Sequence, residues 1–174
     1  MPKFTSLALA AVLVCGGVAS AEAIAGSSAS AASKSVSVTG HLKHPLHLSM
    51  AALAKYKQHT ADVTYLGGMP VETQKHHVYT GPLLLDVINA AGPQFSAAIK
   101  NDQLRWGILV IGNGNYRALI SWGEIEPKLG NQQIILAVTA DGQPLASPRL
   151  VVPKDPRGGR YVDDVSKIKV NPAG

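Results

Sequence analysis

An arginine- and glycine-rich stretch near the end of the sequence has the residue types that can hold an anion. It reads "PKDPRGGRYVDD", residues 153–164, and its basic and glycine members are Lys154, Arg157, Gly158, Gly159 and Arg160. Consecutive glycines let backbone N–H groups converge on an anion, and an arginine can grip it with two parallel hydrogen bonds. The alternative is a polar turn between two strands, in which the aspartates of the stretch neutralise the arginines. The residues alone leave both interpretations open.

Six histidines raise the question of a metal site. His41, His44 and His47 recur at every third residue, and His76 adjoins His77. On a strand these odd intervals put neighbouring histidines on opposite faces, whereas a zinc site needs convergent ligands. The spacing therefore predicts histidines on the surface or in loops and no metal site. His77, close to a tyrosine, is the best functional candidate among them.

The elements that must position these residues indicate a strand-rich, mixed α+β domain. A helix is expected to begin after Ser49, and a second one at Pro82 with its end at Gly92. Ser121 and Glu124 have the spacing of a capping box, which predicts a short helical turn. Alternating or apolar runs predict about eight short strands, among them residues 36–42, 62–68, 76–81, 104–112, 117–121, 133–145 and 160–170. Asp141 and Gly142 predict a turn in the run 133–145.

Two tryptophans could either fill the core or stack on a flat ligand. Trp106 stands in the apolar run "LRWGILVIG" and is expected in the core. Trp122 stands beside the predicted cap at Ser121, where it could be exposed. Ser121 itself is expected to act as a cap and not as a nucleophile, because no G-x-S-x-G elbow surrounds it.

The beginning of the chain has the composition of an export signal. A basic start, an apolar stretch at residues 7–18 and small residues around position 21 predict a secretory signal peptide at residues 1–23. Residues 24–35 are small and polar and predict a flexible lead-in, so that the folded domain should occupy residues 36–170. Cys15 is the only cysteine of the chain and falls within the signal. The exported protein, periplasmic or secreted, would therefore have neither disulfides nor thiolate ligands.

Size and charge limit the classes of function. With 174 residues and 46% hydrophobic content, the chain suits one domain with a real core. Its net charge of +5 comes without a run of lysine or arginine. Such a mild excess suits an anionic small molecule or an acidic protein face, and it does not predict a nucleic-acid partner.

The order of the motifs resembles the molybdopterin-binding domain of the sulfite-oxidase superfamily in a compact form. The motifs are "VTG", "YTGPLLLDVINAAG", "GNGNYRALIS", "ILAVTADGQPL", "PRLVVP" and "GGRYVDDVSKI", between about Val36 and Val170. The resemblance implies that Arg149, Arg160 and the backbone from Gly158 to Tyr161 help to hold a pterin and its phosphate. It also places Tyr116 at a turn of the family's site. A lysine that the family has after the loop arginine is replaced here by Asp163.

One departure from the family concerns the metal. The family's enzymes ligate molybdenum with a cysteine that precedes the "TGPLL" motif, and "VETQKHHVYTG" contains none. A soft, thiolate-held metal site therefore cannot form, although the cradle for the pterin can remain. The expected ligand-binding residues are Arg149, Arg157, Gly158, Gly159, Arg160, Tyr161, Tyr116 and Trp122, with no catalytic or metal-ligating residue.

The resemblance implies a function as an exported protein that binds a metal-free pterin. Members of this kind are thought to influence a membrane signalling partner, including enzymes that make or break a cyclic dinucleotide. Two alternatives stay open from the sequence. One is a molybdopterin-dependent oxidoreductase with an atypical metal ligand, and the other is an interaction domain that has lost its ligand.

Overall fold

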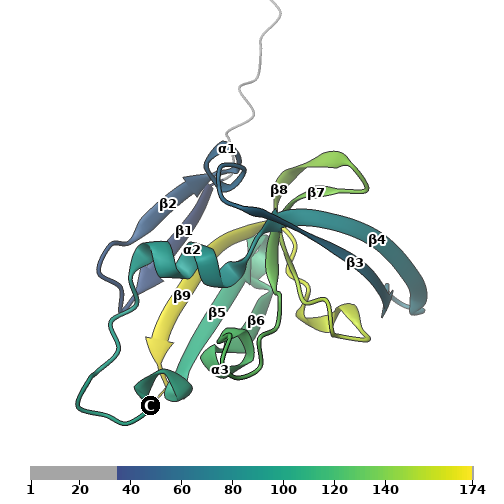
Figure 1. Cartoon of the computed structure of the whole chain (residues 1–174). Helices are drawn as coiled ribbons and strands as arrows, with labels where there is room; N and C mark the ends of the chain where they lie inside the picture. The colour runs from purple at the N-terminus through teal and green to yellow at the C-terminus, as the bar shows by residue number, and fades with distance from the viewer. Residues whose placement is uncertain (1–34, 174) are drawn as a thin grey trace, which may run out of the picture. The chain divides into compact units, whose positions relative to one another are not determined.

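The computed structural model describes residues 35–173, which form two β-sheets with a few short helices (Figure 1). The strands are β1 (Ser35–Gly40), β2 (Leu46–Ser49), β3 (Gln58–Gly67), β4 (Thr73–Pro82), β5 (Trp106–Gly112), β6 (Arg117–Ser121), β7 (Ile135–Ala140), β8 (Gln143–Val151) and β9 (Val165–Pro172). The helices are α1 (Met50–Leu53), α2 (Leu84–Ala91) and α3 (Trp122–Ile125), with 3-10 turns η1 (Asp102–Arg105), η2 (Asn113–Asn115) and η3 (Gly158–Arg160). This strand-rich architecture fits the predicted α+β class. The predicted signal peptide and lead-in lie outside the described residues, apart from Ser35, the last residue of the predicted lead-in, which begins β1.

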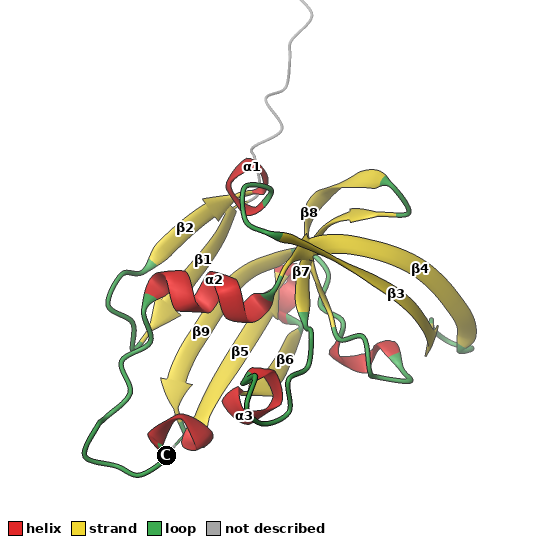
Figure 2. Cartoon of the chain, in the orientation of Figure 1, coloured by secondary structure: helices red, strands yellow, loops and turns green. Residues whose placement is uncertain are grey.

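The first sheet contains five strands in the order β2-β1-β9-β5-β6. Strand β1 runs parallel to β9, and the other neighbours are antiparallel. Along β5 every second side chain is buried, beginning with Trp106, because alternate residues of a strand point to opposite faces. Helix α2 lies across this buried face (Figure 2). The prediction that Trp106 belongs to the core is confirmed.

Helix α2 forms the cover because its apolar residues share one side. Leu84, Val87, Ile88 and Ala91 are all buried, as expected for residues three and four apart. Gly92 ends the helix in the left-handed conformation with a φ of 69°, which glycine adopts easily. The helix begins two residues later than predicted, because Pro82 still pairs with Gln58 in the β3–β4 ladder.

The second sheet has the order β3-β4-β7-β8 and contains a long hairpin. Strands β3 and β4 pair over ten residues each, from Gln58 with Pro82 to Gly67 with Thr73. The far part of this hairpin projects from the rest of the domain (Figure 1), and we call it the β3–β4 arm. At the other hairpin, the predicted turn at Asp141 and Gly142 joins β7 to β8, with positive φ at both residues.

Two details differ from the sequence-based expectations. The last strand begins at Val165 and not at Arg160, because residues 158–160 form the turn η3 and the strand register shifts at Gly112. Trp122 is only 2% exposed, although its place beside a helix cap left room for exposure. The cap itself is confirmed, since Ser121 and Glu124 form the reciprocal capping box. Trp122 is buried because α3 packs its ring inward against Phe95, at 4.8 Å between ring centroids.

A buried carboxylate ties the segment before β5 to the core. Asp102 accepts hydrogen bonds from the backbone N–H of Ser96 at 2.8 Å, Arg105 Nε at 2.6 Å and Trp106 Nε1 at 3.2 Å. The Ser96 N–H, followed by Arg105, lowers the pKa of the Asp102 carboxyl below its ordinary value. The ionised form is therefore favoured by folding.

Replacing Asp102 with asparagine should lower the melting temperature most clearly near neutral pH. A carboxyl whose pKa is depressed in the folded state contributes stability above its unfolded pKa, and this contribution is lost as the pH falls below about 4. The difference in melting temperature between the natural protein and Asp102→Asn should therefore shrink toward pH 3, as measured by thermal unfolding followed by circular dichroism. A difference that grows on acidification would contradict this role.

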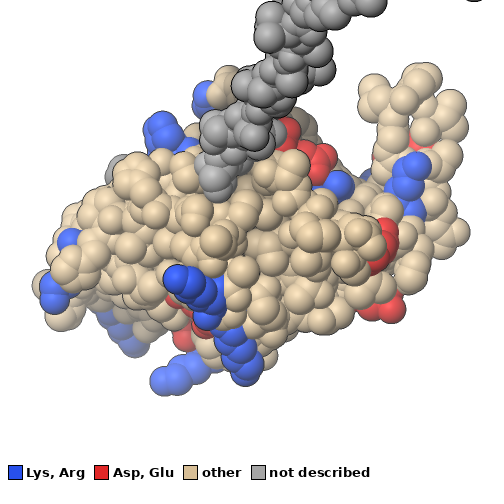
Figure 3. All heavy atoms as spheres, turned by 90° about the horizontal axis from the view of Figure 1, so that it is seen from above, with Lys and Arg blue, Asp and Glu red and all other residues tan. Residues whose placement is uncertain are grey.

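Among the described residues, no helix is long and apolar enough to cross a membrane. Seen from above, lysine and arginine lie in separate small groups among uncharged atoms (Figure 3). This distribution agrees with the absence of a lysine or arginine run in the sequence.

Candidate ligand-binding cavity

A cavity of about 850 Å³ lies between the β3–β4 arm, strand β8 and the segment around η3. Its volume is in the usual range for sites that bind small molecules, about 300 to 1,000 Å³. Its lining residues are Tyr65, Leu66, Gly67, Gly68, Met69, Glu72, Lys75, His77, Tyr116, Arg149, Arg157, Gly158, Gly159, Tyr161, Asp163 and Asp164.

Arg149, from β8, is the most enclosed cation of the lining. Its Nη1 forms an ion pair with Asp163 at 2.9 Å, and its Nη2 donates to Tyr65 Oη at 3.3 Å. The guanidinium lies 5.3 Å from the ring centre of Tyr79 and 5.8 Å from that of Tyr161, within the range of cation–π attraction. Its Nε is buried and has no hydrogen-bond partner among the described residues. Within residues 35–173, Arg149 therefore keeps one N–H that has no protein partner and is shielded from the open cavity.

The tyrosines around Arg149 supply aromatic surface and a second buried polar atom without a partner in the described part of the chain. The rings of Tyr65 and Tyr161 are 4.5 Å apart between centroids. Tyr161 is 4% exposed, and its Oη is buried without a partner among the described residues. Burial raises the pKa of Tyr161 to about 12, and burial also raises the pKa of Tyr79. Both phenols therefore stay protonated at neutral pH and can donate hydrogen bonds.

His77 is held at the cavity by a carboxylate. Its Nδ1 lies 2.7 Å from Asp141 Oδ2, while Asp141 Oδ1 accepts from the backbone N–H of Val78 at 2.8 Å. The Val78 N–H, followed by His77, lowers the pKa of the Asp141 carboxyl. Because an ionised carboxylate only accepts hydrogen bonds, the proton is on Nδ1, and Nε2 remains as the other polar atom of the ring.

The segment that carries the two glycines closes one side of the cavity. Arg157 pairs with Glu72 of the β3–β4 turn at 2.8 Å, and Tyr116 Oη donates to the carbonyl of Gly159 at 2.5 Å. Gly158 lies against Tyr65, where an added Cβ would come within 2.9 Å of the ring. This glycine is thus explained by close packing as well as by its place in the lining.

Arg160 lies elsewhere. It donates from Nε and Nη2 to the two carboxylate oxygens of Asp155, at 2.8 and 2.7 Å, and from Nη1 to Glu124 at 2.7 Å. The hydrogen bonds that it donates to Asp155 and Glu124 raise the pKa of Arg160 further above the ordinary value. Arg160 is not among the residues that line the cavity; it links the η3 segment to α3.

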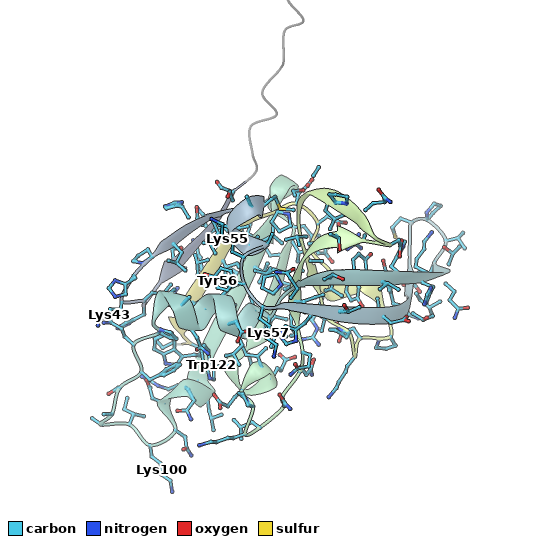
Figure 4. All side chains as sticks on the ribbon, turned by 45° about the horizontal axis from the view of Figure 1, so that its top comes forward. Lys43, Lys55, Tyr56, Lys57, Lys100 and Trp122 are labelled. Atoms are coloured by element: carbon cyan, nitrogen blue, oxygen red, sulfur yellow. The ribbon has the colours of Figure 1, made fainter. Side chains whose placement is uncertain are left out.

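Trp122 is also separate from the cavity. Its indole N–H donates to Glu126 at 3.0 Å, and Figure 4 places its ring beneath α2, away from the β3–β4 arm. Of the residues expected to bind a ligand, the structure thus brings six to the cavity and leaves Arg160 and Trp122 outside. The six are Arg149, Arg157, Gly158, Gly159, Tyr161 and Tyr116. Ligand binding by any of them remains a prediction.

The β3–β4 arm contributes lining residues that were not among the ligand-binding residues expected from the sequence. Tyr65 pairs with Lys75 and Val63 with His77, so that Tyr65, Lys75 and His77 share one face of the arm. The alternation of Tyr65 and Val63 on β3, and of Lys75, His77 and Tyr79 on β4, could have indicated this common face. None of the five remaining histidines lines the cavity. His41, His44 and His47 are exposed, His59 is half-buried on β3, and His76 pairs with Asp62 at 2.7 Å.

Comparisons with known proteins give a likeness in fold. No family model matches the chain, and no curated protein does so either. The crystal structure of the sulfane dehydrogenase SoxCD from Paracoccus pantotrophus is similar, with a TM-score of 0.64 and 15% sequence identity. The match covers 82% of this chain and 39% of the SoxCD chain, so this chain spans less than half of that length. The fold is distantly sulfite-oxidase-like.

The cofactor of sulfite-oxidase-like proteins can be compared with the lining present here. The rings of Tyr65 and Tyr161 and the guanidinium of Arg149 have the chemistry that suits the flat, polar-edged ring of a pterin. The donor set does not suit a thiolate-held metal, since no lining residue is cysteine. Within residues 35–173, no cluster of three or more histidine, cysteine, aspartate or glutamate side chains is arranged to hold a metal ion. Asp163 further engages Arg149, which leaves less positive charge for a phosphate.

Proposed function

We propose that this chain is an exported, periplasmic or secreted protein that binds a metal-free pterin in the cavity beside Arg149. The observation that carries the proposal is the cavity of about 850 Å³ itself, in which the Arg149 guanidinium lies beside the rings of Tyr65 and Tyr161. A cation next to aromatic rings in a cavity of this size is a suitable lining for a flat ligand with polar edges.

A pterin has the matching chemistry. Its carbonyl and ring nitrogens can accept hydrogen bonds from the guanidinium of Arg149, and its amino group can donate to Asp163 or Asp164, which also line the cavity. Its flat ring can pack on tyrosine faces such as Tyr65. We expect the protein to bind the pterin without catalysing a reaction, because no lining residue is a cysteine that could ligate molybdenum as in the enzymes of the sulfite-oxidase superfamily.

We further propose that pterin occupancy is passed to a membrane signalling partner, which can be an enzyme of cyclic-dinucleotide metabolism. The position of the β3–β4 turn supports such a role. Met69 lines the cavity and is 93% exposed, and the neighbouring Val71 is 73% exposed. Exposed apolar side chains at the edge of a ligand site can contact a partner and respond to the ligand at the same time.

The test is to purify the natural protein from its native host and to analyse the denatured supernatant for pterin fluorescence and for molybdenum. We expect close to one fluorescent pterin molecule per protein chain and no stoichiometric molybdenum. Stoichiometric molybdenum would instead favour the oxidoreductase with an atypical ligand.

One observation favours a second candidate, an interaction domain without a ligand. Asp163 already occupies Arg149 at 2.9 Å, so the cation of the cavity is partly neutralised by the protein itself. If the protein is an interaction domain without a ligand, no pterin should co-purify with it, and the purified protein should not bind added pterin.

A further inference from the structure

The side of the five-stranded sheet that faces away from α2 is open to solvent. In β9 the residues that alternate with the buried Ile168 and Val170 are exposed, and the same holds for β6, where Ala118 and Ile120 are buried. Because α2 packs on the buried side, these exposed residues form the opposite surface. We call this surface the open face.

Strand register arranges the open face in two rows. One row runs from Lys167 through Ile111 to Arg117, and the other from Lys169 through Leu109 to Leu119. Neighbouring strands lie about 4.8 Å apart. The apolar side chains of the central strand β5 thus lie between two lysines on one side and Arg117 with Leu119 on the other.

The positive charge of the open face is not neutralised by carboxylates. None of the five strands contains aspartate or glutamate. Lys167 and Lys169 form no ion pair with another described residue, and Arg117 donates to the neutral amide oxygen of Asn115. The acidic residues that directly precede β9 are engaged at the cavity, Asp163 with Arg149 and Asp164 with Ser147.

The heights of the side chains favour a protein as occupant. Ile111 is half-buried between Lys167 and Arg117, and Leu109 is half-buried between Lys169 and Leu119, which is 63% exposed. A partner must therefore reach down between the cations with its own apolar side chains, which a flat bilayer surface cannot do. An apolar centre flanked by charges is the usual anatomy of a protein interface, in which opposite charges steer association.

We propose that the open face docks an acidic protein surface in which apolar side chains alternate with carboxylates. A strand-like segment fits if carboxylates and apolar groups alternate among every second residue, because only these residues share one face of a strand. Carboxylates would then face Lys167, Lys169 and Arg117 while apolar groups meet Leu109, Ile111 and Leu119. This interaction does not depend on the cavity or on its ligand.

The test uses the full chain and a fluorescent peptide with the repeat Glu-Ser-Leu-Ser, in which glutamate and leucine share one face of a strand. Binding is followed by anisotropy. We expect saturable binding that weakens tenfold or more in the double variant Lys167→Glu/Lys169→Glu, and severalfold in Leu119→Ser. A matched control reverses two exposed lysines elsewhere, Lys55→Glu/Lys57→Glu, which lie between α1 and β3 (Figure 4). This control should bind like the natural protein. Circular dichroism checks the fold of each variant.

Parallel measurements use vesicles of phosphatidylglycerol and a DNA duplex as anionic probes without the alternating pattern. Weaker binding of both than of the peptide, at equal concentration of negative charge, is expected. The inference is overturned if the peptide does not bind, if the control variant weakens it as much as the open-face variant, or if vesicles or DNA bind more tightly. Pterin binding should be equal in all these variants, so failure here is distinguishable from failure of the proposed function.

Discussion

Replacing Arg149 with methionine is expected to lower the affinity for pterin-6-carboxylate by about 10- to 100-fold. This range corresponds to the loss of one charge-assisted hydrogen bond, about 1.5 to 3 kcal/mol. The guanidinium of Arg149 lines the cavity and sits beside Tyr79 and Tyr161. Titration calorimetry on the natural protein and the variant measures the change.

Two further variants separate the role of Arg149 from general effects. Arg149→Lys keeps the charge but loses the planar group and its Nε–H, so most of the loss should persist. Arg117→Met removes an exposed arginine on the five-stranded sheet and should leave the affinity unchanged. The fold should tolerate Arg149→Met, because its ion-pair partner Asp163 is 68% exposed and can be hydrated. An affinity within twofold of the natural value would show that Arg149 does not hold the ligand.

Replacing Arg160 with methionine is expected to lower the free energy of unfolding by about 2 to 3 kcal/mol while leaving ligand affinity within twofold. The change leaves Asp155 and Glu124 without their shared cation. Removing one member of a fully buried pair costs about 3 to 5 kcal/mol, and the value is smaller here because Arg160 is 33% exposed. Urea unfolding measures the stability.

Arg157→Met is the matched control for Arg160. Its ion pair with Glu72 is more exposed, at 65% and 41% of the two side chains, so the expected loss is below about 1 kcal/mol. If Arg160→Met were as stable as the natural protein but bound ligand tenfold more weakly, Arg160 would be a ligand-binding residue after all, as the sequence resemblance implies.

Local patterns were sufficient to predict most of the elements. The apolar spacing of α2, the capping box at Ser121 and the Asp141-Gly142 turn depend on residues close together in the chain, and each is present. The position of η3 was harder to predict. Arg160 meets Glu124, 36 residues earlier, and this contact depends on how the two sheets are arranged.

The same limit applies to the candidate site. Arg149, Tyr116 and the two glycines were predicted because the order of the sequence motifs resembles that of the sulfite-oxidase superfamily. Tyr65 and His77 could not be predicted, because they reach the cavity only through the register of the β3–β4 ladder and the packing of that arm against η3. A single arginine-rich stretch thus contained both a lining residue, Arg157, and a structural one, Arg160.

The most direct test of the central claim is a calorimetric titration of the purified, metal-free protein with pterin-6-carboxylate. We expect saturable binding with one site per chain and a dissociation constant at or below the micromolar range, together with a change in the fluorescence of the cavity tyrosines. The absence of measurable binding up to millimolar pterin would contradict the claim and leave the ligand-free interaction domain as the better description.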